Sequence, residues 1–142
     1  MRAIARSFVC ALFVCLASAV GATDADQIAA VLLNLSTSLQ ERNAALFLDQ
    51  VDRKRFSNYA ALEDNVVAMT AQDDAASSIG ILERSRNGDV YELKLDWLIQ
   101  LKRAGGEGPA ERRRETVTCR IERLGKRWKV TSLAPVSFLR PM

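Results

Sequence analysis

Apolar and polar residues alternate between Tyr91 and Lys102 more regularly than anywhere else in the chain. Every second position is apolar, and all but one of the intervening residues are polar. The apolar positions are Tyr91, Leu93, Leu95, Trp97, Ile99 and Leu101. Successive side chains of a strand point to opposite faces of a sheet, so this spacing predicts one long strand with one buried face. The rest of the chain must therefore supply neighbouring strands and a cover for that face.

Shorter strand patterns surround this segment. We expect strands over 78–84, 115–124 and 127–133. Asn87-Gly88 and Gly125-Lys126 are typical of tight hairpin turns, whereas the glycines and proline in 104–110 predict a flexible loop. Pro135 is expected to end the last strand, after which Phe138 and Leu139 should fold back onto the core.

Helical spacing comes before these strands. The expected helices cover 28–39, 44–51 and 59–71. Apolar residues at three- and four-residue steps place one apolar face on each helix. Asn43 is expected to cap the second helix, and Ser57 or Asn58 the third. Helices followed by hairpin-linked strands predict an α+β fold, in which three N-terminal helices pack on a curved four-stranded antiparallel sheet.

The first residues have the order of a secretory signal peptide. Arg2 and Arg6 precede a short apolar run at 7–16, and small residues up to Ala19 and Ala22 offer two cleavage sites. We expect cleavage rather than retention as a membrane anchor, because the apolar run is shorter than the ~20 residues that span a bilayer. Residues 1–22 are then the signal and 23–142 a single domain, exported to the periplasm or secreted, with no transmembrane segment.

Cysteine positions argue against a lipoprotein. Lipid attachment needs a small residue before the cysteine, but Val9 precedes Cys10 and Val14 precedes Cys15. Cleavage would leave Cys119 alone, which cannot form an internal disulfide. A packed core must then provide the stability.

Charge is divided unevenly along the chain. The sequence has 20 basic and 17 acidic residues, and 18 and 17 remain after residues 1–22. Residues 24–83 carry four basic and ten acidic residues, and residues 84–142 carry fourteen and seven. The basic half could attract an anionic partner, or the two halves could attract each other. We expect no nucleic-acid binding, because the mature chain is near neutral and no aromatics alternate with the arginines.

This layout resembles the nuclear transport factor 2-like superfamily, whose members are also called SnoaL-like or cystatin-like. The resemblance lies in the helix around 58–62, the long strand at 90–97, and the closing strand 126–133 with its W-x-[IV]-x-x-[IL] pattern. It implies a sheet curved into a cone around the helices, a pocket at the wide end, and frequent dimers. It implies no activity, because this fold hosts several enzymes, transport factors and accessory domains.

Aromatic side chains on the expected inward faces are the candidate ligand contacts. They are Tyr59, Tyr91, Trp97 and Trp128. The alternative for each is ordinary core packing, with the tyrosine hydroxyls reaching water.

The absence of histidine limits the possible chemistry. It removes the usual acid–base residue and the commonest metal ligand. Asp49 and Asp52 could serve as a base but are more typical of solvated carboxylates, Asp96 is expected to point outward, and Cys119 is expected to be a buried apolar residue. We therefore assign no catalytic residue and expect no metal and no cofactor.

A basic cluster lies on the last two expected strands. Its candidate anion-binding members are Arg112, Arg113, Arg114, Arg120 and Arg127. The alternative is a solvated face that nearby glutamates neutralise in part.

Together these patterns favour an exported, non-enzymatic domain that binds a small apolar molecule or an envelope protein at the cone mouth. One alternative is an isomerase- or dehydratase-like enzyme that uses a carboxylate and a tyrosine inside the cone. Another is a module that docks on an anionic surface through the arginines. The resemblance, together with an outward Leu98, also predicts a homodimer through the outer sheet face.

Overall fold

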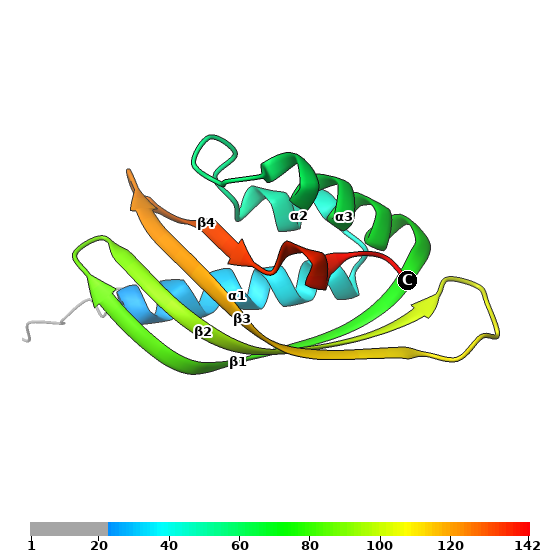
Figure 1. Cartoon of the computed structure of the whole chain (residues 1–142). Helices are drawn as coiled ribbons and strands as arrows, with labels where there is room; N and C mark the ends of the chain where they lie inside the picture. The colour runs from blue at the N-terminus through cyan, green and yellow to red at the C-terminus, as the bar shows by residue number, and fades with distance from the viewer. Residues whose placement is uncertain (1–22) are drawn as a thin grey trace, which may run out of the picture.

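The computed structural model describes residues 23–142, so the predicted signal peptide lies outside the described residues. Within this range three α-helices precede a four-stranded antiparallel sheet (Figure 1), which confirms the predicted α+β class. The elements are α1 (Asp24–Gln40), α2 (Ala44–Asp49), α3 (Tyr59–Gln72), β1 (Asp73–Asn87), β2 (Val90–Arg103), β3 (Glu111–Leu124), β4 (Arg127–Ala134) and the short 3-10 helix η1 (Val136–Leu139).

Local capping explains where the helices begin. Thr23 and Asp26 form a capping box at the start of α1, each side chain accepting the backbone N–H of the other residue. Asn43 caps α2 as predicted, accepting the Leu46 N–H at 3.0 Å. Asn58 precedes α3 as predicted, but it makes no capping hydrogen bond with its side chain and instead takes a left-handed conformation with φ 62°. Asparagine tolerates this conformation better than most residues.

The strands follow one another in the order β1-β2-β3-β4. The first hairpin turn differs slightly from the prediction. Asn87 belongs to β1 and pairs with Val90, and only Gly88 takes a positive φ, of 59°. Gly125, with φ 65°, occupies the matching position in the second turn. Glycine reaches this conformation without steric cost.

Two strands begin earlier than the alternation suggests. β1 starts at Asp73 rather than at residue 78, because residues Asp73 to Ser77 pair with Ile99 to Arg103 of β2. β3 likewise starts at Glu111 rather than at residue 115. These extensions contain small or charged residues with little strand preference of their own. Their conformation comes from hydrogen bonding to the long β2.

All three helices lie on the same side of the curved sheet, as Figure 1 shows. The apolar faces of the helices and strands meet in one hydrophobic core. The free edge of β4 is covered, because the backbone around Val51 pairs with Val130 in a parallel bridge. After β4, Phe138 and Leu139 fold back and are buried, as predicted. No helix among residues 23–142 is long and apolar enough to cross a membrane.

Candidate functional site

The middle of the cone is packed with apolar side chains. Trp97 lies at its centre with no exposed surface. Its indole N–H donates to the Ser77 hydroxyl at 2.9 Å, and its ring centroid lies 5.7 Å from that of Phe138. These contacts satisfy the indole completely. They place Trp97, a candidate ligand contact, in the core.

The structure brings two other ligand candidates together at one end of the cone. Tyr91 and Trp128 meet edge to face, with ring centroids 5.3 Å apart. Arg86 covers both rings, its guanidinium carbon 5.1 Å from the Tyr91 centroid and 5.9 Å from that of Trp128. Its Nη2 also donates to Asp24 at the start of α1, at 2.7 Å. The two hairpin turns and the start of α1 form this region, which we call the hairpin end. The Arg86 side chain covers it.

Sequence reasoning did not find Arg86. The bulge in β1 between Ile81 and Glu83 places Arg86 opposite the inward Tyr91. A bulge changes which residues point inward, and nothing in the local residue pattern marks it. The fourth ligand candidate, Tyr59, is half-buried at the start of α3 and lies against Arg53, whose guanidinium carbon is 5.5 Å from the ring centroid. Burial, followed by the nearby Glu63, raises the pKa of the Tyr59 hydroxyl.

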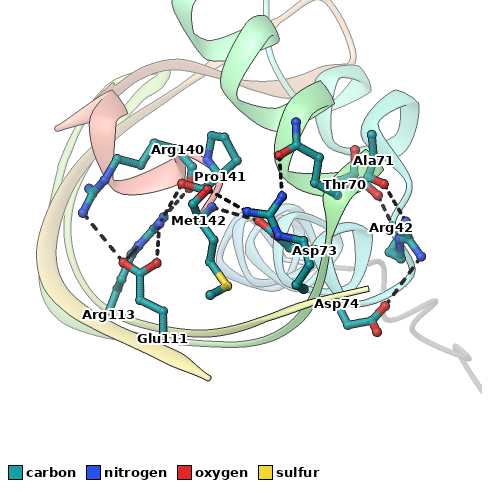
Figure 2. Close-up of polar contacts among 12 residues, drawn as sticks. Arg42, Thr70, Ala71, Asp73, Asp74, Glu111, Arg113, Arg140, Pro141 and Met142 are labelled. Atoms are coloured by element: carbon teal, nitrogen blue, oxygen red, sulfur yellow. Dashed lines mark hydrogen bonds and ion pairs between the residues drawn. The ribbon is translucent and has the colours of Figure 1, made fainter. Parts of the chain in front are cut away.

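Buried charges gather at the opposite end, shown in Figure 2. We call it the loop end; it comprises the α3–β1 junction, the ends of β2 and β3 that the loop 104–110 joins, and residues 138–142. Asp73 is fully buried there, and Arg113 is 7% exposed. Glu111 holds the Arg113 guanidinium with two hydrogen bonds, Nε to Oε1 at 2.8 Å and Nη2 to Oε2 at 3.0 Å. The bond from Arg113 keeps the pKa of Glu111 below its usual value.

Backbone atoms of residues 138–142 complete the loop end. Arg113 donates to the carbonyl oxygens of Phe138 and Pro141, both at 3.1 Å, and to that of Arg140. Asp73 accepts the Met142 N–H at 3.0 Å through Oδ2. Within the described residues, Asp73 Oδ1 has no hydrogen-bond partner, although Arg103 Nε lies 3.7 Å from it. Asp73 lies just beyond the expected helix 59–71, and nothing in the sequence pattern marks it.

Replacing Glu111 with glutamine should reduce the acid sensitivity of the fold. A carboxylate whose pKa is lowered by folding stabilises the native state above its ordinary pKa of 4.5, and that contribution is lost as the pH falls through the lower folded value. Urea unfolding at about pH 7 and about pH 3.5 should therefore show a smaller loss of stability for Glu111→Gln than for wild type. Glu83→Gln, at an exposed position, is the control. Equal losses in all three proteins would contradict the assignment.

The predicted basic cluster does not form one surface. Arg113 points inward and donates hydrogen bonds at the loop end. The prediction that it belongs to a surface cluster is therefore wrong, because the residue is buried. Arg114 donates two hydrogen bonds to the Asp96 carboxylate across the outer sheet face, at 2.8 and 2.9 Å. Arg127 donates one to Asp49 at 2.8 Å. These hydrogen bonds lower the pKa values of both aspartates. Both carboxylates are therefore ion-pair partners rather than bases.

Asp52 also has a local structural role. Its Oδ1 accepts the N–H groups of Lys54 and Arg55 at 3.0 and 2.8 Å, which stabilises the turn after α2. No group of three or more histidine, cysteine, aspartate or glutamate side chains in residues 23–142 is arranged to hold a metal ion.

The outer sheet face carries the two remaining arginine candidates. Arg112 and Arg120 are both exposed there. Arg120 lines a shallow groove of about 450 Å³ together with Glu92, Lys94 and residues of the other strands. None of the helices in residues 23–142 covers this face, and Leu98 is half-buried on it. The homodimer through this face stays a prediction.

The fold has counterparts among solved structures, although no protein-family model and no curated protein matches the sequence. A protein with a cystatin-like fold from Novosphingobium aromaticivorans, described as nuclear transport factor 2-like, superposes with a TM-score of 0.60 at 15% identity, over 78% of this chain and 79% of that one. A protein of unknown function from Shewanella oneidensis, also described as nuclear transport factor 2-like, gives 0.59 at 15% identity, over 78% and 97%. The chain has the nuclear transport factor 2-like fold. A hexachlorocyclohexane dehydrochlorinase gives 0.59 at 14% identity, over 75% and 80%.

This nuclear transport factor 2-like cone therefore has a solid apolar middle between two polar ends. At the hairpin end, Arg86 covers an aromatic pair in which the buried Trp128 Nε1 has no partner among the described residues. At the loop end, Asp73 and Arg113 hold the backbone of residues 138–142. The similar structures share less than a fifth of their residues with this chain, so the likeness defines the fold and not an activity.

Proposed function

We propose that this protein is an exported, non-enzymatic binding domain that holds its partner at the loop end of the cone. The observation that carries this proposal is the pair of buried charges, Asp73 and Arg113, which make hydrogen bonds to backbone atoms. Burying charged groups costs free energy unless partners satisfy them. Two such groups at the loop end, now bonded to residues 138–142, are suited to hold polar groups of a ligand.

The positions of the candidate residues favour binding over catalysis. The alternative enzyme needs a carboxylate and a tyrosine close together inside the cone. Asp73 is the buried carboxylate, but it pairs with Arg103 at the far end of β2 from Tyr91, and a strand of that length separates them by roughly 40 Å. Tyr59 starts α3 and Asp73 follows its other end, roughly 20 Å along the helix. Neither tyrosine reaches Asp73.

Native mass spectrometry of the protein exported by its own leader tests this proposal. We expect a partner or small molecule that accompanies the native protein and separates on denaturation. Asp73→Asn should reduce the adduct, whereas Asp74→Asn, next to it on β1 and largely exposed, should not. The denatured mass reports whether cleavage follows Ala19 or Ala22. A bare native mass, or an adduct unaffected by Asp73→Asn, would count against binding at the loop end.

A further inference from the structure

We propose that the loop end is a binding site for the main chain of an extended peptide, and that residues 140–142 occupy this site within the same chain. The proposal rests on the proposed function of the loop end and names the class of ligand.

Every hydrogen bond between residues 138–142 and Asp73, Arg103 or Arg113 involves a backbone atom of that segment. Arg113 donates to the carbonyls of Phe138, Arg140 and Pro141, and Arg103 Nη2 donates to the Met142 carbonyl at 3.3 Å. Asp73 accepts the Met142 N–H. All peptides carry these groups. A different extended segment could therefore make the same bonds, whatever its side chains.

Contacts within the strands position most of the charged groups of the site, although the Arg140 guanidinium also lies 3.9 Å from the Glu111 carboxylate. Glu111 grips Arg113 from the same strand with two hydrogen bonds. Asp73 and Arg103 are direct register partners on β1 and β2. The site should therefore keep its shape when the segment leaves, which reduces the ordering cost of binding another peptide.

The segment divides into an anchored part and a detachable part. Phe138 and Leu139 are 1% and 2% exposed and belong to the core. Arg140 and Met142 are exposed, and Pro141 is half-buried (Figure 2). Residues 140–142 are not part of the hydrophobic core cluster, so they can leave the site without opening the core.

The present occupant leaves one polar atom of the site unused. Asp73 Oδ1 is buried and accepts no hydrogen bond from the described residues. Residues 140–142 offer Asp73 only the N–H of Met142, since the Arg140 N–H donates to Ser137 and Pro141 has none. A peptide without proline at that position brings a second N–H to the site. Such a peptide could compete with the chain's own segment.

Competition sets the affinity to expect. A segment tethered this closely acts at an effective concentration of about a millimolar or more, so an added peptide meets a site that is mostly occupied. Weak but saturable binding of a short synthetic peptide is therefore expected for the wild-type protein.

Fluorescence anisotropy with a labelled peptide tests the inference on the full chain. The peptide carries the sequence of residues 136–142 with Pro141 replaced by alanine and an amidated end. A second peptide is identical except for an N-methyl group on the nitrogen that corresponds to Met142. The methyl group removes the N–H that Asp73 accepts, so we expect binding at least about tenfold weaker. A scrambled peptide that keeps this N–H should bind within about threefold of the first, because the recognised groups are in the main chain.

Two variants locate the site. Arg113→Met should weaken binding of the first peptide about tenfold or more, whereas Arg112→Met, next to it but on the exposed outer face, should change it less than about twofold. No saturable binding to wild type, or equal binding of the methylated and unmethylated peptides, would overturn the inference. The peptide comparison uses the wild-type protein, so it decides the matter even if Arg113→Met fails to fold.

Results of the two experiments separate the two proposals. If a native adduct depends on Asp73 but the synthetic peptides do not bind, the loop end is still a binding site. Its ligand is then not a peptide. If peptide binding depends on Arg113 and on the N–H that corresponds to Met142, the result directly supports an extended peptide as the ligand.

Discussion

Replacing Trp97 with alanine should lower the free energy of unfolding by about 3–5 kcal/mol. The side chain has no exposed surface, packs against Phe138 and donates its N–H to Ser77. The substitution leaves a cavity and removes the hydrogen-bond partner of the half-buried Ser77 hydroxyl. A domain of this size is typically stable by about 5–15 kcal/mol, so the variant should unfold at a much lower urea concentration.

Leu98→Ala is the matched control, since this residue is next to Trp97 but lies half-buried on the outer sheet face. It should cost less than about 1.5 kcal/mol, because its partial burial leaves less surface to lose. The comparison also separates the two roles considered for Trp97. If the tryptophan lined a ligand pocket instead of the core, the two variants would have similar stability.

Cys119 should react with thiol reagents about a thousandfold more slowly in the native protein than in the unfolded chain. Cys119 is 3% exposed, and burial raises the pKa of its thiol from 9.0 to about 12. Only the thiolate attacks, so at a pH near 8 the raised pKa reduces the reactive fraction by about three orders of magnitude. The barrier to reagent entry slows the reaction further.

The rate is measured with a chromogenic disulfide reagent, before and after addition of urea. Subtracting the rate of Cys119→Ser removes any contribution from Cys10 and Cys15. Rapid native labelling would mean that β3 opens readily to solvent. It would also make Cys119 a candidate nucleophile, a role that its buried position argues against.

The patterns that predicted the fold correctly were all local. Alternation from Tyr91 to Lys102 identified the buried face of β2, and the stripe ending at Leu39 identified the inner face of α1. Each residue's direction in a regular element depends on its position in the element, so these faces can be read from spacing alone. The caps and glycine turns marked the ends of several elements for the same reason.

The candidate site was predicted much less well. The five arginines appeared to be one cluster, yet Arg113 points inward while Arg112 and Arg114 point outward, and Arg127 bonds Asp49 of α2. Asp73 was not identified at all, because its burial depends on β1 continuing beyond its apolar pattern to pair with β2.

The sequence by itself therefore determined the elements, their order and the residues that form the core, because hydrophobic periodicity and turn chemistry act over a few neighbouring residues. Only the tertiary structure decided which polar groups became functional candidates. The bulge in β1 turned Arg86 over the aromatic pair, and the chain's return after β4 brought the backbone around Met142 to Asp73. Such contacts join residues far apart in the chain. They are set by the bulge and by the path of the chain after β4, which no local residue pattern specifies.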